Sequence, residues 1–286
     1  MKKRFVIYSA CTHRYDALEA PQETDDRFDY ILFSDTLPAE AMGAWEVRSI
    51  PFRHDDPAKT ARWVKCHPET LLSDYDASVW IDSNIRILDP SVYDEILAVL
   101  DSPTLVSSLR HPQRDCIYQE MMTVMASRLD TESTLLRWGH RLRSSRYPIH
   151  NGLSETGLLI RKHNDPRVVQ LDRIWWDCIA HYSRRDQLSF DYALWRCHLD
   201  RSTFLDGDIR QDPRFVLHTH TSGHQRQLPL QHPSRLYRYL MNRPEQRDTI
   251  AAAYYAAYRS PLPRWAAAWR GQWLRFKLRG GKTKKV

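Results

Sequence analysis

Three consecutive polar residues, Asp82, Ser83 and Asn84, follow a short apolar run in the first third of the chain. The run at 78–81 is rich in β-branched and aromatic residues, which predicts a strand buried on both faces. If the backbone stays extended after it, Asp82 and Asn84 project to one side and Ser83 to the other. Two hard oxygen ligands on one side suit Mg²⁺ or Mn²⁺. The same residue types are equally typical of a turn, because short polar side chains bond to their own backbone.

A helical pattern covers residues 57–72, immediately before this strand, and carries Arg62 and Lys65 three residues apart on one face. Helix faces often carry solvated Arg and Lys residues that have no function. A nucleotide diphosphate, however, brings negative charge that one metal ion neutralises only in part, and guanidinium and ammonium groups can supply the rest. Arg62 and Lys65 are therefore candidates for binding a diphosphate.

Three histidines, His218, His220 and His224, lie close together late in the chain. Imidazole binds divalent metals well, so one of them is a candidate metal ligand. His218 and His220 share a face if the backbone is extended, and they are the two leading candidates. The three could instead form an independent zinc site, although no Cys or carboxylate is close in sequence to complete one.

The elements that position these residues alternate between strands and helices, which predicts an α/β fold. We expect strands at 5–8, 30–33, 45–50, 78–81 and 105–108, with a further strand within 151–161. We expect helices at 57–72, 91–100 and 168–182, and another beginning at Ser183. The first strand is followed by a polar loop at 9–12. Loops at the carboxyl ends of strands bind nucleotides in doubly wound sheets, which makes Thr12 a candidate.

The stretch Trp-Ile-Asp-Ser-Asn-Ile around Asp82 resembles the aspartate-x-aspartate-like motif of nucleotide-sugar glycosyltransferases with the GT-A fold. More closely, it resembles a glycosyltransferase-like family, first described as a domain of unknown function and typified by plant pectin and mucilage proteins. An Arg-x-x-Lys-x-x-Pro pattern that ends at Pro68, and a His-Pro and an Arg-x-Cys at His111 and Arg114, also match that family. The resemblance implies a GT-A-like mixed central sheet flanked by helices. Asn84 in place of a second aspartate departs from the commonest metal motif.

The resemblance also implies roles for further residues. Asp35, near the end of the second strand, would hold the base or ribose of the donor. The loop with His111 and Arg114 would bind the sugar donor. Ser83, which lies between Asp82 and Asn84, would also contact the donor. Glu155 would line the acceptor and sugar pocket, and the pair Asp186 and Gln187 would contact the sugar ring, as in retaining GT-A enzymes. Each acid could instead be structural: Asp35 as a turn residue, Asp115 and Asp186 as helix caps, and Glu155 as a hydrogen-bond acceptor.

The net charge of +7 is concentrated at the C-terminus. From Arg259 onward there are nine Lys or Arg residues and no acid, which leaves 33 basic and 35 acidic residues in the remainder. This near-neutral remainder argues against a surface that coats nucleic acid. Five scattered cysteines without a Cys-x-x-Cys spacing predict reduced, mostly buried thiols and a cytoplasmic chain.

The tail after Pro263 has the pattern of a basic amphipathic helix. Its large apolar side chains fall on one stripe at helical spacing: Leu262, Trp265, Trp269, Trp273 and Phe276. A narrow aromatic stripe with a cationic remainder suits a helix that lies in a membrane interface. The stripe could equally dock on the main domain or on a second subunit.

These observations predict a GT-A-like domain over residues 1–230 and a helical basic extension over 231–286. The predicted reaction moves a sugar from a nucleotide-diphosphate sugar to a hydroxyl of a polysaccharide or lipid-linked glycan, assisted by Mn²⁺ or Mg²⁺ and with retention of configuration favoured. The enzyme would be cytoplasmic or peripheral on the inner face of the membrane. Two alternatives remain: a metal-dependent phosphoesterase acting on nucleotide sugars, and a non-catalytic membrane-surface binding protein.

Overall fold

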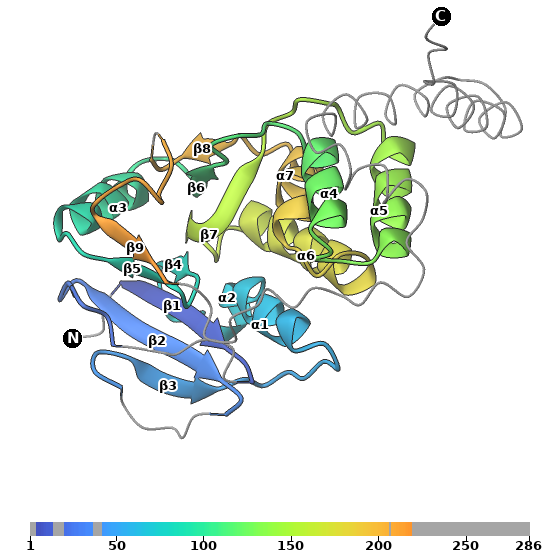
Figure 1. The fold of residues 1–286 in the computed structure, drawn as a ribbon. Helices are drawn as coiled ribbons and strands as arrows, with labels where there is room; N and C mark the ends of the chain where they lie inside the picture. Colours follow the sequence, from blue (N-terminus) through green and yellow to red (C-terminus); the bar gives the residue numbers. More distant parts are fainter. Residues whose placement is uncertain (1–3, 14–19, 37–41, 206, 219–286) are drawn as a thin grey trace, which may run out of the picture.

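The computed structural model describes residues 4–13, 20–36, 42–205 and 207–218. They form a mixed α/β fold around a seven-stranded sheet (Figure 1). The strand order is β3 (Glu46–Ser49), β2 (Phe28–Ser34), β1 (Phe5–Cys11), β4 (Ala77–Ile81), β7 (Ser154–Arg161), β6 (Val106–Arg110) and β8 (Ser202–Thr203). A separate two-stranded ribbon pairs β5 (Ile85–Ile87) with β9 (Phe215–Leu217). The predicted α/β class, with a mixed central sheet flanked by helices, is confirmed.

The direction of the strands decides which loops meet. Strands β1 to β4 run parallel to one another, and β7 is antiparallel to both of its neighbours, β4 and β6. The start of β7 therefore lies at the same sheet edge as the ends of β1, β4 and β6. Strand β4 is central and entirely buried, as predicted. Its position places the segment at Asp82 in the middle of that edge.

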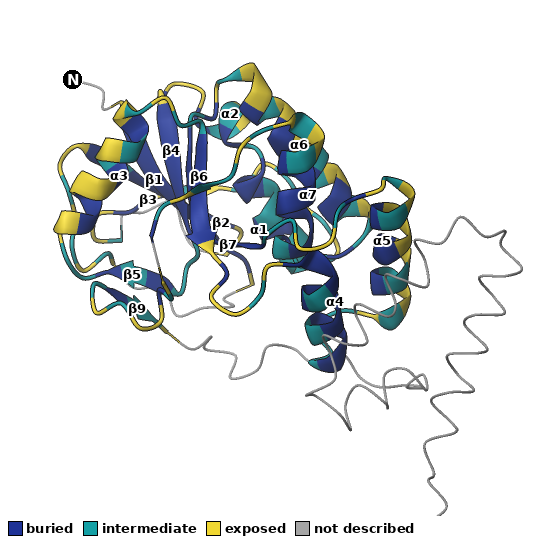
Figure 2. Cartoon of the chain, turned by 90° about the horizontal axis from the view of Figure 1, so that it is seen from above, coloured by how far each residue is buried: buried dark blue, intermediate teal, exposed yellow. Residues whose placement is uncertain are grey.

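Helices cover both faces of the sheet. One face packs on α3 (Ser91–Asp101), and the other on α1 (Pro57–Lys65), α6 (Pro166–His181) and α7 (Gln187–Cys197). The alternation of side chains along β1 builds both cores at once: Phe5 and Ile7 face α3, whereas Val6 and Tyr8 face α1 and α6. The outer side of α3 is exposed in the view coloured by burial (Figure 2).

A third apolar cluster joins α4 (Ile117–Ala126) and α5 (Glu132–Ser144) to α7. Helix α5 was not predicted from the sequence. Four of the five cysteines are buried and none forms a disulfide, in agreement with the prediction of mostly buried thiols. Within the described ranges, no helix is long and apolar enough to cross a membrane. The predicted basic tail and the whole of the predicted extension at 231–286 lie outside the described residues.

Several local predictions were wrong. The expected helix at 57–72 is two helices, α1 and α2 (Pro68–Leu71), because Pro68 restricts His67 to a non-helical backbone. The first strand continues to Cys11, so most of the predicted loop at 9–12 is strand. The last helix begins at Gln187 rather than at Ser183. Asp115 does not cap the helix that follows it; its carboxylate lies 2.7 Å from the His150 ring.

The backbone at Asp82 is a turn rather than an extended strand. The Ile85 N–H donates to the Asp82 carbonyl over 2.9 Å, which closes a turn between β4 and β5. The alternation expected for Asp82, Ser83 and Asn84 therefore does not apply. The turn is held to β7 by the Asp82 N–H, which donates to the Gly157 carbonyl over 2.8 Å. The alternative interpretation of this segment as a turn was right about its conformation.

Candidate active site

A cleft of about 740 Å³ opens at the sheet edge where β1, β4 and β6 end and β7 begins. It is bounded by the end of β1, the turn after β4, the start of β7 and the segment before α7. Eight of the predicted site residues line it: Thr12, Arg62, Asp82, Ser83, Asn84, Glu155, Asp186 and Gln187. These residues come from parts of the chain as much as 175 positions apart, and the sheet topology brings them together.

Asp82 is held by its neighbours through one oxygen only. Its Oδ1 accepts a hydrogen bond from the Trp80 ring N–H over 2.7 Å. The same oxygen lies 3.4 Å from Lys65 Nζ and 3.8 Å from Arg62 Nη1. Its Oδ2 has no polar partner among the described residues. Asp82 therefore offers one uncommitted carboxylate oxygen to the cleft.

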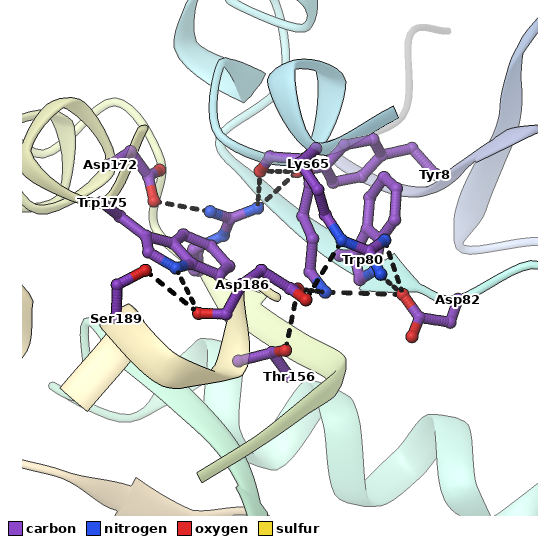
Figure 3. Close-up of polar contacts among 11 residues, drawn as sticks. Tyr8, Lys65, Trp80, Asp82, Thr156, Asp172, Trp175, Asp186 and Ser189 are labelled. Carbon is purple, nitrogen blue, oxygen red and sulfur yellow. Dashed lines mark hydrogen bonds and ion pairs between the residues drawn. The ribbon is translucent and has the colours of Figure 1, made fainter. Parts of the chain in front are cut away.

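Asp186 is the most heavily bonded acid of the cleft (Figure 3). Its Oδ2 lies 2.5 Å from Lys65 Nζ and accepts a hydrogen bond from the Thr156 hydroxyl over 2.9 Å. Its Oδ1 lies 3.1 Å from Arg62 Nε. Burial disfavours the charge on this carboxyl, but the positive charges of Arg62 and Lys65 prevail and hold the pKa of Asp186 well below its ordinary value. Asp186 is therefore a carboxylate at neutral pH.

Lys65 lies beneath the cleft rather than at its surface. Its side chain is fully buried, and its ammonium lies 5.2 Å from the centre of the Trp80 ring and 5.7 Å from that of Trp175. A buried charge is tolerated only when it is paired, and Asp82 and Asp186 supply the opposite charges. Lys65 thus joins the two acids, and of the predicted cationic pair only Arg62 reaches the cleft.

A second buried ion pair, between Arg161 and Asp172, contacts the backbone of Lys65 (Figure 3). Arg161 Nη1 lies 2.6 Å from Asp172 Oδ1, and both side chains are fully buried. Arg161 Nη2 donates to the Lys65 carbonyl over 2.6 Å and also bonds to the Tyr8 hydroxyl. The Tyr8 hydroxyl donates to the same Lys65 carbonyl over 3.0 Å. These contacts fix the end of α1, from which Lys65 reaches the two acids.

Asn84 and His218 are brought together although 134 residues separate them. Asn84 Nδ2 donates to the His218 carbonyl over 3.1 Å, and the His218 N–H donates to the Asn84 carbonyl over 2.8 Å. A carboxylate, an amide oxygen and an imidazole are ligand types that Mg²⁺ or Mn²⁺ accepts, but the hydrogen bonds place only the backbone of His218 beside Asn84, and His218 is not among the residues that line the cleft, so the predicted metal site stays a prediction. Across the described ranges, no three His, Cys, Asp or Glu side chains gather as a metal site. His220 and His224 lie outside those ranges.

Glu155 lies on the β7 side of the cleft and is paired with Arg210. The Arg210 Nη1 atom is 2.9 Å from Glu155 Oε1 and 3.0 Å from Asp208 Oδ1. Burial raises the pKa of Glu155, and the charge of Arg210 opposes that rise. A carboxylate with a raised pKa that faces a cleft can exchange protons with a bound hydroxyl.

Thr12 also lines the cleft, but its hydroxyl is committed, since it donates to the Pro57 carbonyl over 3.1 Å. Asp35 does not line the cleft. It accepts the His13 N–H over 2.9 Å and lies 3.0 Å from the His13 ring, so it fixes the loop that follows β1. Its predicted contact with a base or ribose stays a prediction.

His111 and Arg114 form a small cluster that is separate from the lining of the cleft. His111 Nδ1 accepts the backbone N–H groups of Gln113 and Arg114 over 3.1 and 3.0 Å. Arg114 Nε donates to Glu120 Oε2 over 2.6 Å. Burial, together with the charge of Arg114, lowers the pKa of His111 to about 4. The structure gives this pair a local structural role, and its predicted binding of the sugar donor stays a prediction.

Several cleft residues were not predicted from the sequence as site residues, and four of them place polar or charged side chains near the predicted acids: Thr156, Arg184, Arg185 and Arg210. Thr156 follows Glu155 directly, so it could have been found by asking what shares the start of β7. Arg184 and Arg185 directly precede Asp186, so they could have been found as the cations next to a predicted site acid. Arg210 lies in a loop without any local pattern, and only the fold places it beside Glu155.

Comparison with known proteins identifies the family to which the chain belongs. A family model described as "TOD1/MUCI70, glycosyltransferase-like domain" matches residues 2–211. No curated protein matches the chain. Among solved structures, the chain is similar to the apo structure of a bifunctional glycosyltransferase, WbbM, with a TM-score of 0.42 and 14% identity. That similarity covers 71% of this chain and 38% of the other.

Proposed function

The chain belongs to the TOD1/MUCI70 glycosyltransferase-like family, and we propose that it moves a sugar from a nucleotide-diphosphate sugar to a hydroxyl of a glycan or lipid-linked glycan. The observation that carries this proposal is the shared cleft of Asp82, Asp186, Gln187 and Glu155 at the carboxyl end of the central strand. Open α/β sheets bind their ligands at that edge. The volume of the cleft, about 740 Å³, is in the range of small-molecule and cofactor sites.

The proposed roles divide the residues into two groups, which Arg62 and Lys65 join because they contact both Asp82 and Asp186. Arg62, Lys65 and Asp82 would lie beside the leaving diphosphate, and Asp186 would lie beside the sugar. Both oxygens of Asp186 are already bound by Lys65, Arg62 and Thr156. We therefore assign Asp186 to orienting the sugar and its cationic neighbours, rather than to forming a covalent bond with the sugar.

Glu155 is the proposed base for the acceptor hydroxyl. In the reaction, the acceptor oxygen forms a bond to the anomeric carbon while the bond from that carbon to the diphosphate breaks. The bonding electrons leave with the diphosphate, and the hydroxyl proton passes to Glu155. Burial raises the pKa of Glu155, which is the direction that suits this task, because a carboxylate with a higher pKa is a stronger base. The resemblance around Asp186 favours retention of configuration, which the anomeric configuration of the product would test.

Asp82, Asn84 and His218 are the residues that would hold Mn²⁺ or Mg²⁺. Such an ion would neutralise charge on the leaving diphosphate. Of the cations on that side, Arg62 lines the cleft, but its charge is already paired with Asp186 at 3.1 Å, so a bound diphosphate would have to share it. Removal of divalent ions with a chelator should abolish or sharply reduce transfer, and added Mn²⁺ or Mg²⁺ should restore it. Unchanged transfer after chelation would contradict the metal assignment.

The test is a transfer assay on the full chain with a panel of nucleotide-diphosphate sugars and hydroxyl acceptors. Asp82→Asn and Asp186→Asn should each lower the rate by about 100-fold or more, since electrostatic groups at a reacting centre contribute on that order. Asp177→Asn, on the exposed side of α6, is the control and should leave the rate unchanged. Release of phosphate from nucleotide sugars without any acceptor would instead favour a phosphoesterase.

The acceptor and the location of the enzyme are proposed from the basic aromatic tail. A helix at the membrane interface would suit a lipid-linked acceptor used in polysaccharide biosynthesis at the cytoplasmic face. Flotation of the full chain with anionic vesicles, compared with a chain truncated after Pro261, tests this. Equal flotation of the two chains would contradict it.

A further inference from the structure

The arginines of the cleft differ in whether their charge is already used. Three of the four that line it are paired with carboxylates: Arg62 with Asp186 at 3.1 Å, Arg184 with Asp56 at 3.6 Å, and Arg210 with Glu155 at 2.9 Å. An incoming anion can use these groups only by weakening an existing ion pair. The fourth arginine is Arg185.

The Arg185 side chain has no hydrogen bond or ion pair with any residue that the structure describes. Its backbone, in contrast, is fixed at both ends. Its N–H donates to the Ser183 hydroxyl over 3.1 Å, and its carbonyl accepts the Leu188 N–H over 3.0 Å. Burial raises the pKa of Asp186, and the guanidinium of Arg185 is close enough to help Arg62 and Lys65, whose effects are larger, to lower it. A firmly anchored residue thus presents an uncommitted charge to the cleft.

Asp186 itself does not use up this charge. Its carboxylate already pairs with the charges of Lys65 and Arg62 and accepts a hydrogen bond from the Thr156 hydroxyl, so its negative charge is balanced. On the other side of Asp186, the amide nitrogen of Gln187 is buried without a hydrogen-bond partner in the described part of the chain. Leaving a buried donor unpaired is costly, which points to a ligand that accepts from it. Arg185 and Gln187, the sequence neighbours of Asp186, thus both line the cleft and each carries a donor without a partner among the described residues.

We propose that Arg185 and Gln187 form an anion subsite that holds a phosphate of the donor and of the leaving nucleoside diphosphate. The inference rests on the proposed function for the identity of the anion. Arg185 would bind the phosphate with its planar fork, and Gln187 would donate one further hydrogen bond. A hydrogen bond to a charged group in such a site is worth about 10- to 100-fold in affinity.

Titration calorimetry with inorganic pyrophosphate and with a set of nucleoside diphosphates tests the subsite on the full chain. Arg185→Gln should weaken binding of both probes by about 10- to 100-fold, and Arg185→Lys should recover part of the loss. Arg184→Gln is the matched control. It removes the neighbouring guanidinium, which is already committed to Asp56 and to the Leu129 carbonyl, and binding should stay within about threefold of the unmodified protein.

Gln187→Glu provides a second, nearly isosteric variant. It replaces the unpaired donor with an acceptor of negative charge and should weaken pyrophosphate binding at least as much as Arg185→Gln does. Equal losses in Arg184→Gln and Arg185→Gln would overturn the proposal, as would unchanged affinity in folded Arg185→Gln. Failure of the unmodified protein to bind either probe would overturn it too. Arg185-dependent binding without any sugar transfer would support the subsite and count against the glycosyltransferase reaction.

Discussion

Replacing Lys65 with Met should destabilise the protein by about 3 kcal/mol at pH 7. Met fits the space beneath the Trp80 and Trp175 rings but carries no charge, so the variant isolates the effect of the ammonium. Breaking a buried ion pair by removing one partner costs about 3–5 kcal/mol. We take the lower end of that range because Arg62 Nε remains 3.1 Å from Asp186.

The assay is urea unfolding followed by tryptophan fluorescence, in a double-mutant cycle with Asp186→Asn. The cycle should give a coupling energy of about 2 kcal/mol between Lys65 and Asp186, because they are in direct contact at 2.5 Å. Lys59→Met is the matched control. Lys59 lies on the same helix and donates to the Ala180 carbonyl over 2.7 Å, so its loss should cost only about 1 kcal/mol. A coupling energy below about 0.5 kcal/mol, or equal costs for the two lysine variants, would refute the reasoning.

Two further predictions concern buried charges. Asp172→Leu alone should destabilise the protein by about 3–5 kcal/mol, because it leaves the buried Arg161 guanidinium without its carboxylate partner. The double variant Arg161→Met with Asp172→Leu should recover most of that stability but keep a lowered transfer rate, because the Lys65 carbonyl loses the hydrogen bond from Arg161. Urea unfolding and transfer assays measure the two effects, and full activity in the double variant would contradict the role of Arg161 in positioning Lys65. His111 is neutral in the folded protein because its pKa is lowered to about 4, below the ordinary 6.5, so the unfolded chain binds more protons between these values. Its contribution to stability is therefore complete above pH 6.5 and is lost, by up to about 3 kcal/mol, as the pH falls to 4; His111→Asn should flatten this slope, and an unchanged slope would contradict the assignment.

Six of the nine strands in the described residues were predicted, because each of the six carries its own local signal, whereas β5, β8 and β9 were not. The run at 78–81 indicated a strand buried on both faces, and the structure gives a fully buried central strand, β4. The same local logic failed one residue later, where Asp82 begins a turn. The turn exists because β5 must pair with β9, which is 128 residues further along the chain. No local pattern could have revealed that partner.

The site was predicted as a set of residues but not as a set of contacts. Asp82, Asp186 and Gln187 were each recognised from short motifs, and all three line the cleft. Lys65 was recognised as a cation, yet whether it faces solvent or the core depends on Trp175, 110 positions later. His111 was placed with the donor site by resemblance, and the fold buries it among its own loop and Arg114.

The contacts also change the role of Arg62 and Lys65, which the sequence analysis had grouped as a diphosphate-binding pair. Arg62 and Lys65 face Asp82 and Asp186, so these four side chains carry two positive and two negative charges and are neutral as a group. A neutral group attracts a diphosphate only weakly, but it can hold its members in one geometry. The charge that offsets the diphosphate must then come from outside the group. Arg185, whose side chain has no hydrogen bond or ion pair in the described part of the chain, is one such source, and a divalent ion held at Asp82 would be another. Removing either should therefore weaken diphosphate binding more than any change that keeps the group neutral.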